Sequence, residues 1–271
     1  MKKSNSYAEK HRLLFGLPTN EHKFLYEYLT ISPSYFRAHQ LISGSPISTE
    51  SLSSIDRWES VLKTYELCGD VFTQTFNGWW DQRGRKAFYT KQKDEGYLLA
   101  GPMSLMTNKV NNKTLIDGIS LVHMKSWKEL KTGKKIENWR LGMDSSINSK
   151  WKQLLKIHRG KTVQNLEART LLGEIVSKKL KVALWIAENA ARGEFPSTKP
   201  IRSGLTFENK EIEFAMSLSE QAYAVEMDDM KKNGISPIKE AKKRSARRHK
   251  LEAKIAQEVE RRIQIHLAKT S

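Results

Sequence analysis

The sequence predicts a mainly α-helical protein, a multi-helix, bundle-like fold with a small irregular or β-containing insertion around residues 91–145. Apolar residues recur at three- and four-residue intervals through residues 55–80 and 163–191, as they do on the buried face of a helix. Residues 91–145 hold several glycines and polar breaks, which are typical of short strands and loops. We therefore expect an N-terminal helical region, residues 1–145, which contains the insertion, and a C-terminal helical region, residues 146–271.

The first strong local pattern lies in residues 24–44, where two short helices are joined tightly. Apolar residues at positions 24–29 favour the first helix. Ser32 is a good N-cap for the second helix. Pro33 is a good first residue, because the N–H groups of the first turn have no partner within the helix and proline has no N–H. The second helix is expected to end at Gly44.

This segment resembles the second half of a bacterial helix-turn-helix, whose second helix enters the major groove of DNA. Ile31, Ser32 and Phe36 occupy the apolar, capping and apolar positions of that motif, whereas Tyr26 stands where the motif has a small residue. The resemblance covers about 20 residues and implies three contacts with base edges or phosphates: Arg37, His39 and Gln40. Simple packing of the two helices is the alternative interpretation.

A long amphipathic helix is expected next, from Ile55 to Trp79 or Trp80, with Gly69 as a point where it can kink. Its end leads into a stretch in which aromatic and cationic residues alternate. Bases stack on flat side chains while cations hold the phosphates, so this pattern is typical of a surface for single-stranded nucleic acid. The candidates are Trp79, Trp80, Arg83, Arg85 and Lys86. The same aromatic residues could instead close a core.

Three further helices are expected in the C-terminal region: residues 163–191, residues 208–230, and a last one that opens at Ser236-Pro237. Residues 203–230 hold seven acidic residues and one basic residue. The last helix is strongly basic, and its candidates for phosphate contacts are Lys242, Lys243, Arg244, Arg247, Arg248 and Lys250. A solvated charge run, or pairing with the acidic helix before it, remains the alternative.

The composition favours an anionic partner. Among 271 residues, 47 are Lys or Arg and 30 are Asp or Glu, which gives a formal net charge of +17. The single cysteine, Cys68, excludes an internal disulfide and a multi-cysteine zinc site, which fits a reducing compartment such as the cytoplasm. No apolar run reaches the roughly 18 residues that cross a bilayer, so no membrane partner is expected.

Evidence for an enzyme is weaker. The seven histidines occur in no spacing that is typical of a metal site. Asp117, Glu129 and Lys131 have the residue types of a Mg²⁺-dependent nuclease of the PD-(D/E)xK type, in which two carboxylates hold the metal and a lysine stabilises developing charge. Those enzymes place the pair on a central strand, whereas residues 126–133 favour a short helix and a turn.

The hypothesis that unites these observations is a nucleic-acid-binding protein without catalysis of its own and without a cofactor. It would act as a regulator or as the targeting subunit of a nucleoprotein complex, with DNA favoured over RNA, and would make protein contacts through residues 163–230. One alternative is an interaction or scaffold subunit that binds an acidic protein. The other is the Mg²⁺-dependent nuclease.

Overall fold

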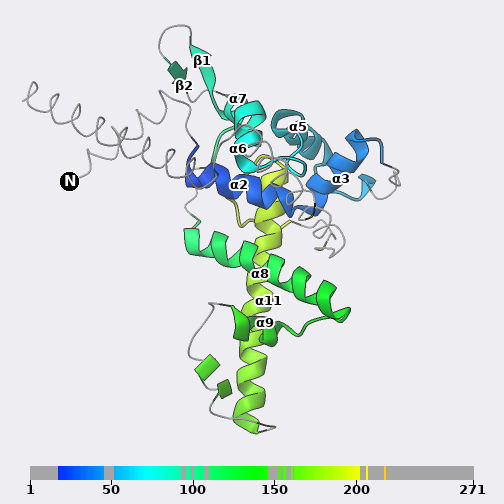
Figure 1. Ribbon diagram of the computed structural model, residues 1–271, viewed down its shortest axis with the longest axis vertical. Coiled ribbons are helices and arrows are strands. Elements are labelled where there is room, and N and C mark those ends of the chain that lie inside the picture. Colours follow the sequence, from blue (N-terminus) through cyan, green and yellow to red (C-terminus); the bar gives the residue numbers. More distant parts are fainter. Residues whose placement is uncertain are drawn as a thin grey trace, which may run out of the picture.

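The protein is mainly α-helical in the computed structural model, which confirms the expected fold class (Figure 1). The structure describes residues 18–45, 52–92, 96–98, 101–106, 110–145, 152–153, 155–156, 160, 162–201, 206 and 217. The principal elements in chain order are α2 (Asn20–Thr30), α3 (Pro33–Ile42), α5 (Trp58–Cys68), α6 (Phe76–Trp79), the π-helical turn η1 (Trp80–Gly84), α7 (Arg85–Phe88), β1 (Thr90–Gln92), β2 (Gly96–Leu98), α8 (Asn112–Thr132), α9 (Asn138–Asp144) and α11 (Val163–Ala191).

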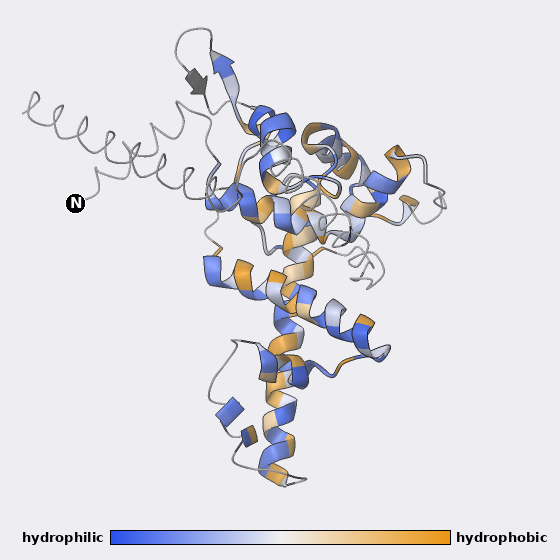
Figure 2. Ribbon diagram, in the orientation of Figure 1, coloured by the Kyte–Doolittle hydropathy of each residue, from blue (hydrophilic) through white to orange (hydrophobic). Residues whose placement is uncertain are grey.

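Helix α11 is the central element of the described part of the chain. It has 29 residues with the expected bounds, and at about 1.5 Å per residue it is roughly 43 Å long. Its C-terminal half packs against α2, α3 and α5, and the rest of it packs against α8 and α9 (Figure 1). Hydrophobic residues therefore recur along both parts of this helix (Figure 2). The expected boundary between residues 1–145 and residues 146–271 stays a prediction.

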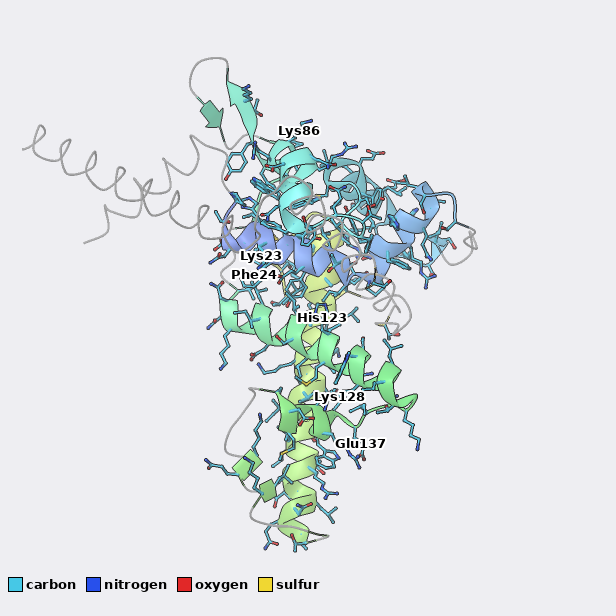
Figure 3. All side chains as sticks on the ribbon, viewed as in Figure 1. Lys23, Phe24, Lys86, His123, Lys128 and Glu137 are labelled. Carbon is cyan, nitrogen blue, oxygen red and sulfur yellow. The ribbon has the colours of Figure 1, made fainter. Side chains whose placement is uncertain are left out.

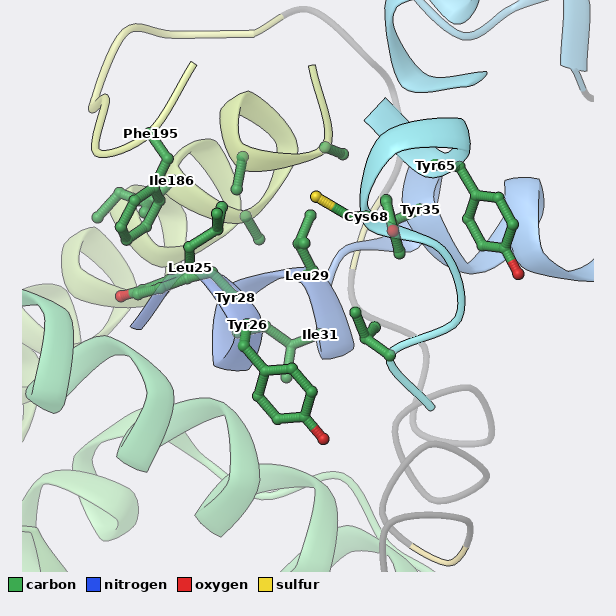
Figure 4. Packing of buried hydrophobic residues seen from close by; sticks show 14 of the residues in the cluster. Leu25, Tyr26, Tyr28, Leu29, Ile31, Tyr35, Tyr65, Cys68, Ile186 and Phe195 are labelled. Carbon is green, nitrogen blue, oxygen red and sulfur yellow. The ribbon is translucent and has the colours of Figure 1, made fainter. Parts of the chain in front are cut away.

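Three clusters of buried side chains surround α11. The largest joins α2, α3 and α5 to the C-terminal half of α11, and Leu25, Tyr28 and Ile186 lie within it (Figure 4). Two smaller clusters hold α8 and α9 on α11. Leu121 of α8, Leu141 of α9 and Val176 of α11 form one of them. The other contains Leu155, Ala168 and Leu172.

The expected helix pair at residues 24–44 is present. The Ser32 side chain accepts a hydrogen bond from the backbone N–H of Tyr35 at 3.2 Å, and Pro33 is the first residue of α3. The chain then leaves the helix at Gly44, which has a φ of +78°. Capping and turn chemistry thus set both ends of α3, as the sequence indicates.

The prediction of a single long helix from residue 55 to residue 80 is wrong. Helix α5 ends at Cys68 because Gly69 adopts a φ of +68°, a left-handed value that interrupts the helix. Asp70 then closes a turn, since its Oδ1 accepts a hydrogen bond from the backbone N–H of Phe72 at 2.7 Å. The chain becomes helical again only at Phe76, the first residue of α6.

The region of residues 91–145 also differs from the expectation in part. The β structure is an antiparallel hairpin in which Thr90 pairs with Leu98, and it is the one sheet among the described residues. Residues 112–132 form α8, although Gly118 lies in its middle. A Cβ at Gly118 would lie 2.6 Å from the hydroxyl oxygen of Tyr28, so this glycine lets α8 approach the core closely.

The helix predicted at residues 208–230 and the last helix, which opens at Ser236-Pro237, lie outside the described residues, apart from residue 217. Among the residues that the structure describes, no helix is both long enough and apolar enough to span a membrane.

His22 near the start of α2 makes the stability of this core dependent on pH. Its Nδ1 accepts a hydrogen bond from the backbone N–H of Thr19 at 3.0 Å, and its ring packs 4.8 Å from Trp80 and 4.5 Å from Phe88 between centroids. Burial lowers the pKa of His22 from 6.5 to about 4, although Glu21 opposes the shift. The folded protein therefore holds this ring neutral at pH values at which the unfolded chain would protonate it.

We expect the free energy of unfolding to fall by about 2 kcal/mol on account of His22 between about pH 7 and pH 5. The sign follows because the unfolded state binds more protons throughout this window, and the contribution is complete only above the unfolded pKa of about 6.5. In His22→Gln, an amide can accept the same backbone hydrogen bond without titrating. Urea unfolding of both proteins at the two pH values measures the difference, and equal pH dependence would contradict the assignment.

Candidate functional site

The first sequence-predicted site, on α3, is largely enclosed. Its N-terminus faces α11, where Glu188 Oε1 accepts hydrogen bonds from Ser32 Oγ at 2.8 Å and from the backbone N–H of Ser34 at 3.0 Å. In a helix-turn-helix the N-terminal residues of the second helix contact base edges. Since this end of α3 lies in the core, the structure corrects the expectation that α3 enters a DNA groove.

The three residues proposed to read bases from α3 are half-buried: Arg37, His39 and Gln40. His39 Nδ1 lies 2.9 Å from the hydroxyl oxygen of Tyr65 and 3.6 Å from a carboxylate oxygen of Asp70. Burial lowers the pKa of His39, and the nearby Asp70 opposes that shift. These contacts favour the packing interpretation of the helix pair.

Trp79 and Trp80 lie in the core, with exposed fractions of 0% and 3%. Trp79 Nε1 donates a hydrogen bond to the backbone oxygen of Cys68 at 2.8 Å, and Trp80 packs against His22. Gly84 is covered by both indoles, because a Cβ there would lie 2.8 Å from each. The expectation that one of these tryptophans stacks on bases is therefore corrected in favour of core packing.

The cations that follow them have separate environments. Arg85 is half-buried, and its Nη2 lies 2.5 Å from Asp81 Oδ1. Arg83 and Lys86 are exposed. Lys86 and Lys128 of α8 lie on opposite sides of α2 in the view of Figure 3. The basic candidates of the last helix lie outside the described residues: Lys242, Lys243, Arg244, Arg247, Arg248 and Lys250.

Asp117, Glu129 and Lys131 do not form one metal site, because all three lie on α8. Positions 117 and 129 are about 18 Å apart along a helix, too far for their carboxylates to share a metal ion. Asp117 pairs with Lys179 at 2.8 Å, and Glu129 pairs with Lys125 at 2.5 Å. No group of three or more possible metal ligands occurs among the described residues.

A different surface, formed by the C-terminal half of α8 and by α9, combines aromatic rings with cations. It contains a shallow, open pocket of about 470 Å³, within the roughly 300–1,000 Å³ that ligand sites occupy. The residues that line it are Trp127, Lys128, Lys131, Thr132, Ile136, Trp139, Arg140, Met143 and Asp144. We call these nine residues, together with Arg169 of α11, the α8–α9 surface. Lys128 marks its place in Figure 3.

Both tryptophans of this surface have cations over their rings. Lys131 Nζ lies 4.9 Å from the ring centroid of Trp127. Arg169 Cζ lies 4.5 Å from the ring centroid of Trp139, and Arg140 Cζ lies 5.3 Å from it. All three distances are below the limit of about 6 Å for a cation–π contact. Trp127 is 53% exposed, and Trp139 is half-buried.

Local structure explains how these side chains meet. Trp127 and Lys131 are four residues apart on α8, so they share one face of the helix. The link between α8 and α9 is held by Glu129, whose Oε1 accepts a hydrogen bond from the backbone N–H of Ile136 at 3.0 Å. Lys128 of α8 forms an ion pair with Asp144 of α9. The two helices thus present their side chains to one pocket.

Five residues of this surface are not among the candidates that the sequence suggests: Trp127, Lys128, Trp139, Arg140 and Arg169. A local signal exists in the Trp127–Lys131 spacing, which predicts a cation–π pair on any helix that includes both residues. Trp139 and Arg169 belong to different helices, so their contact depends on the docking of α9 on α11. No sequence pattern within one element could reveal it.

No protein-family model matches this chain, and no curated protein or solved structure matches it either. Its function therefore has to follow from the chemistry of its own surfaces. On the α8–α9 surface, Lys131 and Arg169 place positive charge against exposed or half-exposed indoles. Such an arrangement can bind a ligand that has both a flat apolar part and a negative charge.

Proposed function

We propose that the protein binds nucleic acid, without catalysis of its own, and that the α8–α9 surface is its contact within the described part of the chain. The observation on which the proposal rests is that one pocket is lined by two tryptophans and three cations, with Arg169 over the second indole. Nucleic acid is the biological polymer that has flat bases and a negative charge at every residue.

The charge balance of the surface supports an anionic ligand. Its cations are Lys128, Lys131, Arg140 and Arg169, whereas Asp144 is its one carboxylate. Asp144 pairs with Lys128, and Glu137 beside the surface pairs with Arg140 at 2.9 Å. Lys131 and Arg169, which lie over the indoles, have no ion pair to a carboxylate among the described residues. Positive charge is therefore left for phosphates.

Other cations could extend the contact. Arg83 and Lys86 are exposed, and the residues from Lys242 to Lys250 add a strongly basic segment. A net charge of +17 favours rapid association with a polyanion. We propose a regulator or a targeting subunit of a nucleoprotein complex in the cytoplasm, a location that the single cysteine supports, with protein contacts through residues 163–230. DNA and RNA both offer the required chemistry.

Binding of the full chain to labelled double-stranded DNA, single-stranded DNA and RNA across about 50–300 mM salt tests the proposal. We expect affinity to fall steeply with salt, because each phosphate contact releases a counterion. In Lys131→Gln, the slope of log affinity against log salt should decrease by about 0.7–0.9. Lys63→Gln is the matched control, because Lys63 is an exposed lysine of α5 outside the α8–α9 surface, and we expect a smaller change there.

The outcome that would contradict the proposal is the absence of binding to all three probes at the lowest salt. A truncation after Gly234 separates the basic segment from the α8–α9 surface. If binding of the truncated protein keeps its sensitivity to Lys131→Gln, the surface acts independently of that segment. A stable complex with an acidic protein that survives nuclease treatment, without binding to the three probes, would favour the scaffold alternative.

A further inference from the structure

We infer that the ligand of the α8–α9 surface is an unpaired, single-stranded segment of nucleic acid whose bases stack on Trp127 and Trp139. This inference rests on the proposed function and names the class of nucleic acid. It assigns the specificity of the surface to the two indoles and leaves the phosphates to the cations around them.

The exposure of Trp127 is the first argument. More than half of this side chain, 53%, is accessible to solvent, whereas Trp79 and Trp80 are buried in the core. Lys131 Nζ lies over one face of the ring, 4.9 Å from its centroid, so a base would stack on the part of the indole that this flexible side chain leaves accessible, with the ammonium group nearby. A phosphate that is linked to that base can then approach the ammonium group. Stacking on an exposed indole and ion pairing with a nearby lysine would occur together in one nucleotide.

The second indole makes the same combination across the pocket. Arg169 lies 4.5 Å from the ring centroid of Trp139, and Arg140 lies 5.3 Å from it. Bases stack on guanidinium planes as well as on aromatic rings. Trp139 and its arginines therefore provide a second platform in the pocket that Trp127 lines. Two platforms in one pocket fit a strand with more than one base better than a single aromatic ligand.

A duplex does not satisfy this geometry. In double-stranded nucleic acid the faces of the bases are covered by their neighbours, and only base edges and phosphates are accessible. An indole in the pocket can stack only on a flat group whose face is accessible, and unpaired bases have accessible faces. An acidic protein segment would meet the charge of Lys131 and Arg169 but would offer few flat groups for the rings. The chemistry of the pocket thus favours a single strand.

The test compares two oligonucleotides with the same number of phosphates, oligothymidylate and an abasic strand, against the full chain. We expect the wild type to bind oligothymidylate at least about tenfold more tightly, because stacking is the interaction that the abasic strand lacks. Trp127→Ala should lower the affinity for oligothymidylate about tenfold and leave the affinity for the abasic strand unchanged. Trp127→Phe should restore part of the affinity, because a phenyl ring can still stack.

Trp185→Ala is the matched control, since Lys181 lies over the ring of Trp185 at 5.2 Å but neither residue lines the pocket. We expect its binding to equal that of the wild type. Because Trp127 is exposed, Trp127→Ala should fold, and urea unfolding checks this. Quenching of tryptophan fluorescence by oligothymidylate, weakened in Trp127→Ala, gives a readout that is independent of affinity.

The outcomes separate the inference from the function on which it rests. Equal wild-type affinity for the two oligonucleotides would overturn base stacking but leave phosphate binding intact. If a duplex bound more tightly than the single strand, with an affinity that Trp127→Ala did not change, base stacking would be overturned as well. If thymidine monophosphate competed for the surface as well as the oligonucleotide does, the ligand would be a single nucleotide and not a strand. Absence of binding to every probe would remove the proposed function itself.

Discussion

Glu188→Ala is expected to lower the free energy of unfolding by about 3–5 kcal/mol, the cost of leaving one member of a buried ion pair alone. The side chains of Glu188 and Arg192 are both 0% exposed, and Arg192 Nη1 lies 2.9 Å from Glu188 Oε2. Glu188 also accepts hydrogen bonds from Ser32 and Ser34 at the start of α3. Its removal leaves the Ser32 and Ser34 donors without this acceptor and the Arg192 guanidinium without a carboxylate, with only the backbone oxygens of Glu188 and Asp56 as its partners among the described residues.

Two comparisons make this prediction specific. In the double variant Glu188→Leu/Arg192→Met, the loss should be smaller than the sum of the two single losses, because neither charge then remains buried alone. Glu194→Ala is the matched control, since Glu194 forms a partly exposed pair with Arg57 at 2.5 Å. Exposed pairs contribute about 0–1 kcal/mol. Urea unfolding of the wild type, Glu188→Ala, Glu194→Ala, the double variant and its two single variants measures these losses. Equal losses for Glu188→Ala and Glu194→Ala would contradict this account.

Elements whose ends depend on local chemistry could be predicted from the sequence. Ser32 and Pro33 determine where α3 begins, because a cap and a fixed φ act within one turn. Helix α11 has its expected bounds for a similar reason. The Thr162 side chain accepts a hydrogen bond from the backbone N–H of Asn165 at 3.2 Å, and the chain turns at Gly193 with a φ of +77°. Such signals do not require knowledge of the rest of the fold.

Elements that depend on distant contacts could not be predicted in this way. Phe72 lies in the turn after α5, but its ring is buried in the core. In the sequence, it therefore falls at the same apolar spacing as the buried residues of α5, and the helical pattern continues. Only the end of α8, within residues 126–133, was expected to be helical, because Gly118 has the properties of a helix breaker when considered alone. Only its approach to Tyr28 explains why a glycine is suitable there.

The candidate site follows the same division. Tryptophans among cations can be found in the sequence, but composition cannot tell which tryptophans are buried. Trp79 lies in the core, where its ring packs on Tyr26 of α2 and its Nε1 donates to the backbone oxygen of Cys68, whereas Trp127 of α8 is 53% exposed. Burial is a property of the packed helices. The chemistry of the surface could therefore be anticipated, but its position could not.

Gly142→Ala is expected to disturb the fold and the binding surface together. A Cβ at Gly142 of α9 would lie 2.5 Å from Cγ and 2.7 Å from Cδ1 of Leu172, a fully buried residue of α11. Overpacking of this kind costs about 1–3 kcal/mol of unfolding free energy. Because α9 has to move away from α11, Trp139 should also lose its contact with Arg169, and we expect affinity for single-stranded DNA to fall with stability.

Gly173→Ala provides the matched control, because it makes the same chemical change within α11 beside the same tryptophan. A Cβ there would lie 3.7 Å from the backbone nitrogen of Trp139, which is ordinary contact. Replacing a glycine in a helix interior by alanine should raise the free energy of unfolding by about 0.5–1 kcal/mol. Thermal unfolding and oligothymidylate binding of both variants measure the contrast. If Gly142→Ala were as stable as Gly173→Ala and bound as tightly, close packing of α9 on α11 would not be what positions Trp139.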